Sequence, residues 1–325
     1  MRKLPSRIEL VEVGPRDGFQ NIAAYIPAAD KLRVIRALLA AGVRRMEITA
    51  FVHPKAIPQM ADAEAVAQSA LAQAPPGFSP IALVPNLAGA KRAWQAGLRE
   101  ISYVASVSPA HNEANIRRTH AQSFEELRRI RIELPQLLIR FDAATAFGCP
   151  FLGEIAPEQT LAFLERAVAC GVDACILCDT IGVADPLQVH ALALLAQRAF
   201  PRTRFGLHLH DTRGLGLANT LAGLEAGVTV IETAVGGLGG CPFAPGASGN
   251  TATEDLLYLL QRLGIDTGVD FDRYLEAVEL TRKIVQAPLA SHLSAVPRGN
   301  AAICRPHAGT SDASPRRETR KQEIR

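Results

Sequence analysis

The chain has 325 residues, a hydrophobic fraction of 48%, a charged fraction of 21% and a formal net charge of +3. These values are typical of a globular α/β protein, and the small net charge with only 5% aromatic residues argues against a nucleic-acid partner. The N-terminus lacks a signal-peptide hydrophobic region, and the longest uncharged stretch, residues 233–253, is too rich in Gly and Pro for a membrane helix. With six cysteines that need no disulfide framework, the sequence predicts a cytoplasmic protein with a small-molecule substrate.

Short β-branched runs alternate with longer Ala- and Leu-rich segments along most of the chain. The runs predicted as strands are Ile8–Gly14, Arg45–Phe51, Pro80–Pro85, Glu100–Ser106, Leu137–Ala143, Ala174–Thr180, Arg204–His210 and Val228–Val235. Helical spacing predicts the helices Asp30–Ala41, Asp62–Ala72, Ser123–Glu133, Pro157–Cys170, Pro186–Ala199 and Leu215–Glu225. Proline is expected in the first turn of two of these helices, and glycine is expected just after the end of several, at Gly42, Gly97, Gly171 and Gly227.

Eight strand–helix units of nearly equal length, in about 250 residues, predict an α/β protein with a (β/α)₈ TIM barrel. A doubly wound open sheet is the alternative, but equal units favour closure of the barrel. Two additional C-terminal helices are predicted over Glu254–Leu263 and Phe271–Val285. We therefore expect a barrel domain over residues 1–290 and a C-terminal extension over residues 291–325, whose Gly, Pro, Ser and Arg content is that of a disordered tail.

The first segment with unusual polar residues is Val13–Asn21, at the end of the first predicted strand. A Pro and two Gly surround the pair Arg16–Asp17, which predicts a tight turn that directs both charges into the mouth of the barrel. A surface salt bridge is the alternative interpretation of an isolated Arg–Asp pair.

The second segment, Leu207–Thr212, ends the seventh predicted strand and contains His208 and His210. Side chains two residues apart on a strand share a face, so both imidazoles point the same way. A single histidine at this place would more often be a satisfied core residue. Two on one face at the end of a barrel strand favour a metal site completed by a carboxylate from elsewhere.

The third segment, Gly236–Asn250, is rich in glycine and follows the eighth predicted strand. A flexible loop or a phosphate cradle are the alternatives, but the Lys-Ser/Thr of a P-loop and a GxGxxG fingerprint are both missing. One thiol, Cys241, lies in this neutral segment. Such a segment could close over a site and bring the thiol into it. By contrast, Cys175 and Cys178 lie three residues apart on a strand, so their sulfurs face opposite ways and core packing is expected for both.

Taken together, the three segments resemble the 3-hydroxy-3-methylglutaryl-CoA lyases, which are TIM-barrel metal enzymes acting beside a thioester. The resemblance runs from about Ile8 to Leu289, and its most specific part is the pattern Gly239-Gly240-Cys241-Pro242 followed by Gly249-Asn250. It implies a carbon–carbon lyase of leucine catabolism that splits 3-hydroxy-3-methylglutaryl-CoA into acetyl-CoA and acetoacetate. An acyl-CoA substrate and a homo-oligomer, a dimer, are implied as well.

The same resemblance assigns roles to individual residues. The metal, Mg²⁺ or Mn²⁺, would be held by Asp17, His208, His210 and Asn250. Arg16 would polarise the thioester oxygen, and Cys241 would be the acid/base of the loop. Orienting roles would fall to further acidic positions, namely Glu47, Asp179 and Glu254.

Some residues depart from the family's pattern, and they leave alternatives open. The segment Ser108-Pro109-Ala110-His111 is closer to the condensing synthases, Cys178 stands where Gly is usual, and Phe243 and Pro245 replace more polar residues. A different substrate, such as citramalyl-CoA, is therefore open. A Claisen-type synthase joining acetyl-CoA to a 2-oxo acid is the first rival, although its usual Gly-Glu-Arg element is missing. A catalytically silent barrel used for binding is the second.

Overall fold

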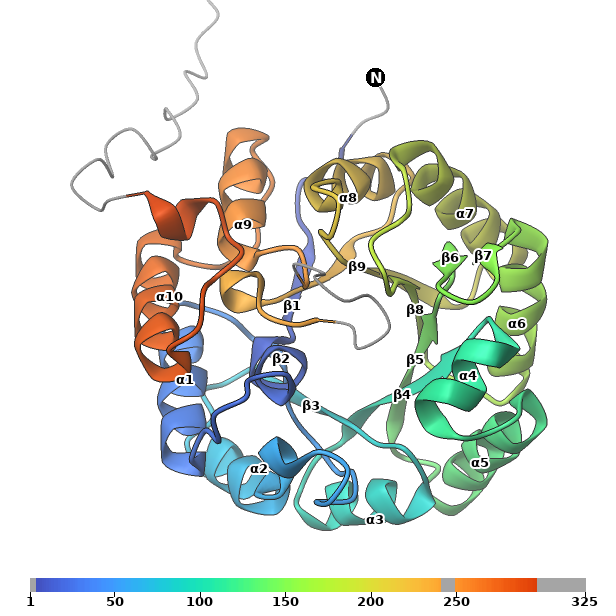
Figure 1. Ribbon diagram of the computed structural model, residues 1–325, viewed down its shortest axis with the longest axis horizontal. Coiled ribbons are helices and arrows are strands. Elements are labelled where there is room, and N and C mark those ends of the chain that lie inside the picture. The colour runs from blue at the N-terminus through green and yellow to red at the C-terminus, as the bar shows by residue number, and fades with distance from the viewer. Residues whose placement is uncertain (1–3, 241–248, 297–325) are drawn as a thin grey trace, which may run out of the picture.

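The computed structural model describes residues 4–240 and 249–296, and in it eight parallel strands close into a barrel (Figure 1). Around the barrel the strands follow the order β1–β10–β9–β8–β5–β4–β3–β2. Their bounds are β1 (Glu9–Glu12), β2 (Arg45–Ala50), β3 (Ser79–Leu83), β4 (Glu100–Ser106), β5 (Leu138–Ala144), β8 (Ala174–Asp179), β9 (Arg204–Leu209) and β10 (Val230–Thr233). A two-stranded hairpin, β6 (Gly148–Cys149) and β7 (Gly153–Glu154), stands apart from it. The closed barrel confirms the predicted fold and excludes the open sheet.

Helices surround the barrel because each buries one apolar face against the outward-facing residues of the strands. Phe141 and Ala143 of β5 belong to this outer core. The helices that follow the strands are α1 (Ala28–Ala40), α2 (Ala63–Ala72), α3 (Leu87–Gln95), α4 (Pro109–Ile116), α5 (His120–Glu133), α6 (Pro157–Ala169), α7 (Pro186–Ala199) and α8 (Gly216–Glu225). Pro157 and Pro186 lie in the first turn of their helices, and the glycines predicted after helix ends, Gly42, Gly97, Gly171 and Gly227, all have positive φ.

Two of these helices were not predicted from the sequence. Helix α3 is short and contains Gly89, a poor helix former, but the side chain of Asn86 caps its N-terminus. The segment of α4 has the sequence of a polar loop. Ser108 caps that helix and Pro109 occupies its first turn, where a missing N–H costs nothing.

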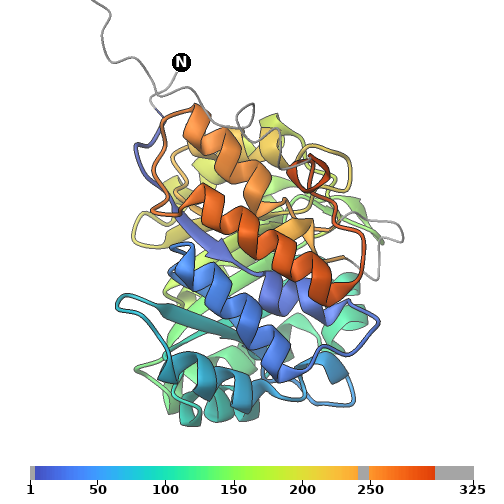
Figure 2. The ribbon, with the colours of Figure 1, turned by 90° about the vertical axis from the view of Figure 1, so that its left-hand side faces the viewer.

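The C-terminal helices complete the ring. Helix α9 (Thr253–Arg262) follows β10, and α10 (Phe271–Val285) packs beside α1, so the two ends of the barrel sequence meet (Figure 2). These helices match the two predicted C-terminal helices. Within the described ranges, no helix combines the length and the apolar character needed to cross a membrane. Of the predicted C-terminal extension, residues 291–296 are described: they include the 3₁₀ turn η4 (Leu293–Ala295), and Ser291 Oγ donates to Asp255 Oδ1 at 3.2 Å. Residues 297–325 lie outside the described residues.

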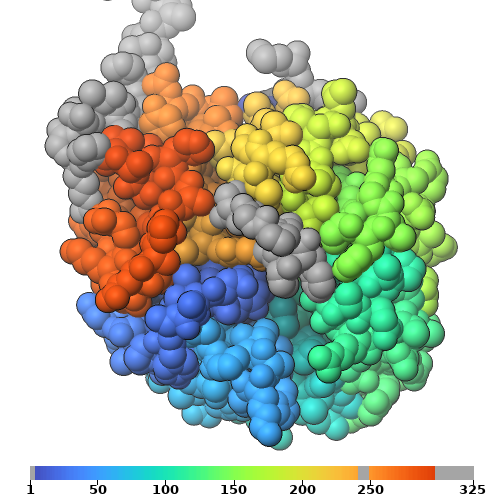
Figure 3. Space-filling model, in the orientation of Figure 1, coloured from blue at the N-terminus to red at the C-terminus, as the bar shows by residue number. Residues whose placement is uncertain are grey.

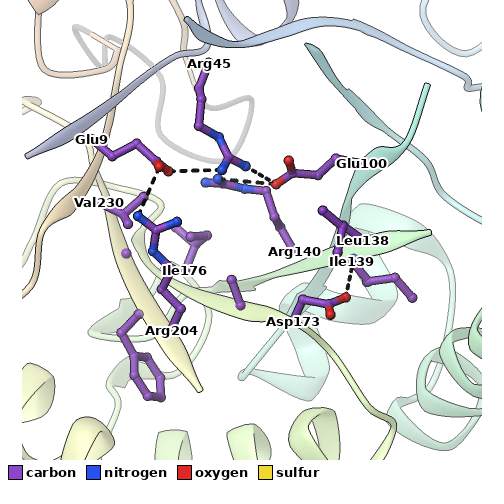
Figure 4. A pocket seen from close by; sticks show the side chains of 13 residues that line it. Glu9, Arg45, Glu100, Leu138, Ile139, Arg140, Asp173, Ile176, Arg204 and Val230 are labelled. Carbon is purple, nitrogen blue, oxygen red and sulfur yellow. Dashed lines mark hydrogen bonds and ion pairs between the residues drawn. The ribbon is translucent and has the colours of Figure 1, made fainter. Parts of the chain in front are cut away.

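The two ends of the barrel differ in character. At the end where the strands begin, Arg45, Arg140 and Arg204 face Glu9 and Glu100 around a cavity of 110 Å³ (Figure 4). Arg45 and Arg204 both pair with Glu9, at 3.3 and 3.0 Å, and Arg140 lies 3.8 Å from Glu100. Ion pairs thus line the cavity at the base of the barrel. The larger cavity opens at the other end, where the strands finish.

Candidate active site

A cleft of 630 Å³ lies at the carboxyl ends of the strands, the face on which TIM barrels carry their sites. Figure 3 looks onto this face, which is hollowed near its centre. Side chains from loops after at least five strands line the cleft, so residues distant in sequence converge there. Its polar lining includes Arg16, Asp17, Gln20, His53, Asn86, His111, Asn115, Arg118, Asp142, Cys178, Thr180, His208 and His210.

The chain leaves β1 in a single π-helical turn, η1 (Gly14–Gly18). Pro15 is its second residue, and the amides of Arg16 and Asp17 both donate to the carbonyl of Val13, at 3.1 and 2.7 Å. π-helical turns are rare and occur mostly at functional sites. The turn buries Arg16 and Asp17 side by side at the mouth of the barrel, where the sequence predicted them, and not on the outer surface.

Arg16 is held between two carboxylates. Its Nε donates to Glu47 Oε2 at 2.5 Å and its Nη1 to Asp17 Oδ1 at 2.6 Å. Burial alone would lower the pKa of Arg16, but Glu47 and Asp17 outweigh it and raise that pKa. Glu47 lies in β2, immediately before a register shift of this strand against β3. The guanidinium is therefore a fixed, permanent positive charge facing the cleft.

Asp17 lies beside both histidines predicted as metal ligands. One ligand atom from each of Asp17, His208 and His210 lies within 4.8 Å of the others. Burial alone would raise the pKa of Asp17, but Arg16, His208 and His210 outweigh it and lower that pKa. Burial and the neighbouring His208 lower the pKa of His210 to about 4, so this imidazole is neutral at physiological pH. An ionised carboxylate and a neutral imidazole are the forms that bind cations.

Asn250 joins this cluster although it is 40 residues beyond His210 in the numbering. Residues 210 and 250 form a backbone bridge, and the amide of Thr251 donates to the carbonyl of Leu209 at 3.0 Å. The Asn250 Nδ2 donates to Asp17 Oδ2 at 2.6 Å. Gly239 makes this approach possible, because a Cβ there would lie 2.4 Å from the Nδ2 of Asn250.

The four residues fit a divalent cation. The Oδ1 of Asn250 and the Nδ1 of His210 are buried and have no hydrogen-bond partner within the described ranges. Buried polar atoms are rarely left unpaired, so these two indicate a missing ligand. Carboxylate, carboxamide and imidazole donors without a thiolate suit Mg²⁺ or Mn²⁺.

Behind the cluster, a buried carboxylate orients His208. Glu232 Oε2 lies 3.0 Å from His208 Nδ1, and its other oxygen accepts a hydrogen bond from Arg140. Burial alone would raise the pKa of Glu232, but Arg140 and His208 lower it to about 2. For His208, burial favours a lower pKa, yet the bond to Glu232 raises it. The pairing fixes the ring so that Nε2 is directed away from Glu232 and remains available as a ligand.

The other predicted site residues have different surroundings. The Asp179 carboxylate accepts the amides of Val183 and Ala184, both at 2.9 Å, and so shapes the loop after β8. Glu254 accepts the amide of Gly236 at 3.0 Å, and burial raises its pKa to about 7. Both carboxylates hold backbone around the site. Cys241, the predicted acid/base, lies outside the described residues.

One prediction about cysteines was half wrong. Cys175 and Cys178 do face opposite ways, and Cys175 packs in the core. Cys178, however, lines the cleft. The reason is its position near the end of β8, in register with His208, where an inward-facing side chain meets the cavity instead of packed apolar atoms.

Several charged residues of the site escaped the sequence analysis, among them Glu12, Arg140, Asp142 and Glu232. Glu12 is fully buried and accepts hydrogen bonds from the amides of Gly14 and Val235, both at 2.8 Å, and so ties η1 to the segment after β10. The sequence contains a signal that could have identified these residues. Charged residues inside otherwise apolar barrel strands are rare unless they are paired or face a site.

We predict that Glu232→Gln weakens metal binding roughly 10- to 100-fold, the usual cost of losing a residue that orients a ligand. One carboxylate now serves both His208 and Arg140, whereas an amide has a single oxygen and must give up one of them. Titration of the metal-free protein with Mn²⁺, followed by calorimetry, measures the effect. Glu100→Gln is the matched control, because it removes a buried carboxylate beside Arg140 without contacting His208. Equal Mn²⁺ affinity of both variants would contradict the prediction.

Comparison with known proteins places these features in a family. A family model described as HMGL-like matches residues 7–281. The hydroxymethylglutaryl-CoA lyase YngG of Bacillus subtilis is 40% identical over 88% of this chain and 96% of its own. The (R)-citramalyl-CoA lyase of Chloroflexus aurantiacus is 39% identical over 87% of this chain and 92% of its own. A solved HMG-CoA lyase of Acinetobacter baumannii, in complex with coenzyme A and 3-methylmalate, superposes with a TM-score of 0.85 at 37% identity, covering 90% of this chain and 96% of that one.

Proposed function

The chain belongs to the HMGL-like family, and from this premise we propose that it is a divalent-metal-dependent lyase acting on a 3-hydroxy-3-methyl dicarboxylyl-CoA. The reaction is the cleavage of 3-hydroxy-3-methylglutaryl-CoA, or of a close analogue, to acetyl-CoA and the corresponding oxo acid. The observation that carries the proposal is the convergence of Asp17, His208 and His210 beside the buried Arg16 at the mouth of the barrel. It unites a cation site with a fixed positive charge in one cleft.

The cation site would consist of Asp17, His208, His210 and Asn250. When bound there, Mg²⁺ or Mn²⁺ supplies Lewis-acid polarisation of substrate oxygens. The other steps of the reaction depend on the protein's own residues. Cleavage requires that the substrate hydroxyl, held beside the Asp17–His208–His210 cluster, loses its proton. The hydroxyl oxygen then becomes the new carbonyl, and the electrons of the broken carbon–carbon bond pass to the thioester as an enolate.

Arg16 supports this step by stabilising the enolate oxygen. Glu47 and Asp17 fix its Nε and Nη1, and Nη2 has no hydrogen-bond partner in the part of the chain that the structure describes. A prearranged donor aimed at the developing charge lowers the barrier without reorganising during the reaction. Because the guanidinium is already buried and oriented, the stabilisation is available as soon as substrate arrives.

The enolate carbon must finally receive a proton. We assign this role to Cys241, which lies in the glycine-rich segment between Gly240 and Asn250. A thiol is a competent general acid at neutral pH. We also propose a cytoplasmic homo-oligomer, a dimer.

The substrate is narrowed to dicarboxylyl-CoA thioesters. Relatives at about the same identity are named for hydroxymethylglutaryl-CoA and for (R)-citramalyl-CoA, whose acyl groups differ by one methylene. Both contain the tertiary alcohol, the thioester and a terminal carboxylate. Cys178, which stands where glycine is usual in the family, lines the cleft. Its side chain leaves less room in the cleft than glycine would, which keeps the shorter citramalyl group a candidate.

A direct assay tests the proposal. The purified protein with Mg²⁺ is incubated with 3-hydroxy-3-methylglutaryl-CoA, citramalyl-CoA and other 3-hydroxyacyl-CoAs, and free acetyl-CoA is followed. We expect acetyl-CoA from at least one dicarboxylyl thioester, together with a stoichiometric oxo acid. If acetyl-CoA is instead consumed with a 2-oxo acid and coenzyme A is released, the protein is a synthase. If no thioester reacts in either direction, a silent barrel replaces the lyase.

A further inference from the structure

Glu12 is a fully buried carboxylate that does not line the cleft. Side chains alternate along β1, where Val11 belongs to the small apolar cluster inside the barrel and Leu10 to the core between the strands and the helices. Glu12 therefore points outward, like Leu10, into the layer between β1 and the helices. Four hydrogen bonds from the described part of the chain stabilise its charge there.

These four bonds join four separate segments. The Oε1 of Glu12 accepts the amides of Gly14 and Val235, both at 2.8 Å. Its Oε2 accepts the hydroxyl of Thr253 at 2.9 Å and the hydroxyl of Tyr274 at 2.5 Å. The partners lie at the start of η1, in the turn after β10, at the start of α9 and in α10. A carboxylate has about four acceptor positions, so Glu12 is fully occupied.

Two of the joined segments contain proposed cation ligands. Gly14 begins η1, three residues before Asp17, and Thr253 begins α9, three residues after Asn250. The fit is tight, because a Cβ on Gly14 would lie 2.6 Å from the Oε1 of Glu12. Glu12 thus holds together, from outside the cleft, the two segments whose side chains meet at the cation site.

Tyr274 supplies the bond that comes from furthest outside the barrel. Its side chain is fully buried in α10, the C-terminal helix that covers the barrel beside α1 (Figure 2). Without the Tyr274 hydroxyl, the Oε2 of Glu12 would keep only the bond from Thr253. A buried charge that loses a donor costs free energy, so we expect Glu12 to shift, and the segments bonded to it to shift with it.

We propose that Tyr274 is a positioning residue for the cation site, and that it acts through Glu12 on the separation of Asp17 and Asn250. The inference rests on the proposed cation site and adds to it a residue that does not line the cleft. The C-terminal helix α10 then does more than cover the barrel. Its tyrosine helps to set the affinity for the cation.

The test compares Mn²⁺ binding by the metal-free parent, Tyr274→Phe and Thr281→Val, measured by calorimetry. Thr281 is the matched control, since it is buried on the same helix and its hydroxyl donates to the carbonyl of Ala277, at 2.8 Å, and not to Glu12. Each substitution removes one buried hydrogen bond, so both should lower the melting temperature of the metal-free protein by similar amounts. Only Tyr274→Phe should weaken Mn²⁺ binding, by about 3- to 30-fold, the range of coupling through a hydrogen-bond network.

A double-mutant cycle tests whether Tyr274 acts through Glu12. An amide has one acceptor oxygen in place of two, so Glu12→Gln should weaken Mn²⁺ binding at least as much as Tyr274→Phe does. Adding Tyr274→Phe to Glu12→Gln should bring little further loss, because both changes act along one path. If the two losses simply add, Tyr274 does not act through Glu12 and the inference is wrong.

Three further results separate the inference from the proposed function. Parental Mn²⁺ affinity in Tyr274→Phe, or the same loss of affinity in Thr281→Val, would overturn the inference. A Tyr274→Phe protein that does not fold would show that the hydroxyl is structural, and would overturn it as well. A parent protein that binds no Mn²⁺ would refute the proposed cation site instead.

Discussion

Removal of divalent cations is expected to abolish carbon–carbon cleavage while the barrel remains folded. The proposed ligands Asp17, His208, His210 and Asn250 lie at the cleft and not in the apolar core. Removing the cation from them should therefore leave the packing of the barrel unchanged. Treatment with a chelator, followed by the acetyl-CoA assay, measures the loss. Adding back Mg²⁺ and Mn²⁺ in separate titrations identifies the cation that restores activity.

A matched variant separates binding from folding. His210→Ala should bind Mn²⁺ more weakly by calorimetry, because it removes one of the clustered ligand atoms. In the metal-free state its melting temperature should equal that of the metal-free parent, since metal stabilises only the protein that binds it. Full turnover by the stripped parent protein would rule out metal dependence. A collapse in the melting temperature of metal-free His210→Ala would instead show a structural role for this histidine.

Arg16→Met is expected to lower kcat by roughly 10²- to 10³-fold, the scale of losing one prearranged donor at a developing oxyanion. The effect should appear in kcat, because the enolate charge exists in the transition state and not in the bound substrate. Steady-state kinetics with the preferred acyl-CoA measure it. A change confined to KM would identify Arg16 as a coenzyme A-binding residue.

The same substitution leaves two carboxylates without their cation, so its effect on stability must be separated from its effect on catalysis. Glu47 loses its partner to Nε and Asp17 its partner to Nη1, and breaking a buried ion pair costs about 3–5 kcal/mol. The double variant Arg16→Met/Glu47→Gln removes one uncompensated charge. It should recover part of the melting temperature without recovering kcat. Recovery of both would mean that Arg16 acts only by holding the site together.

Local patterns in the sequence were sufficient to predict the fold and to single out His208 and His210 as candidate ligands. The alternation of β-branched and Ala/Leu-rich segments reflects strand and helix propensities, and eight such units leave few architectures open. The spacing of His208 and His210 places both on one face of a strand whatever its neighbours are. Asp17 and Asn250 followed from the resemblance, and the bridge between residues 210 and 250 shows how the fold brings them there.

Tertiary structure alone decided which buried charges share a layer of the barrel. Glu232 reaches His208 because β10 and β9 pair these two residues in register. Such pairings depend on strand register around a closed barrel, a long-range property that no local pattern encodes. The sequence thus determined which residues could bind a cation. The register determined which carboxylate orients them.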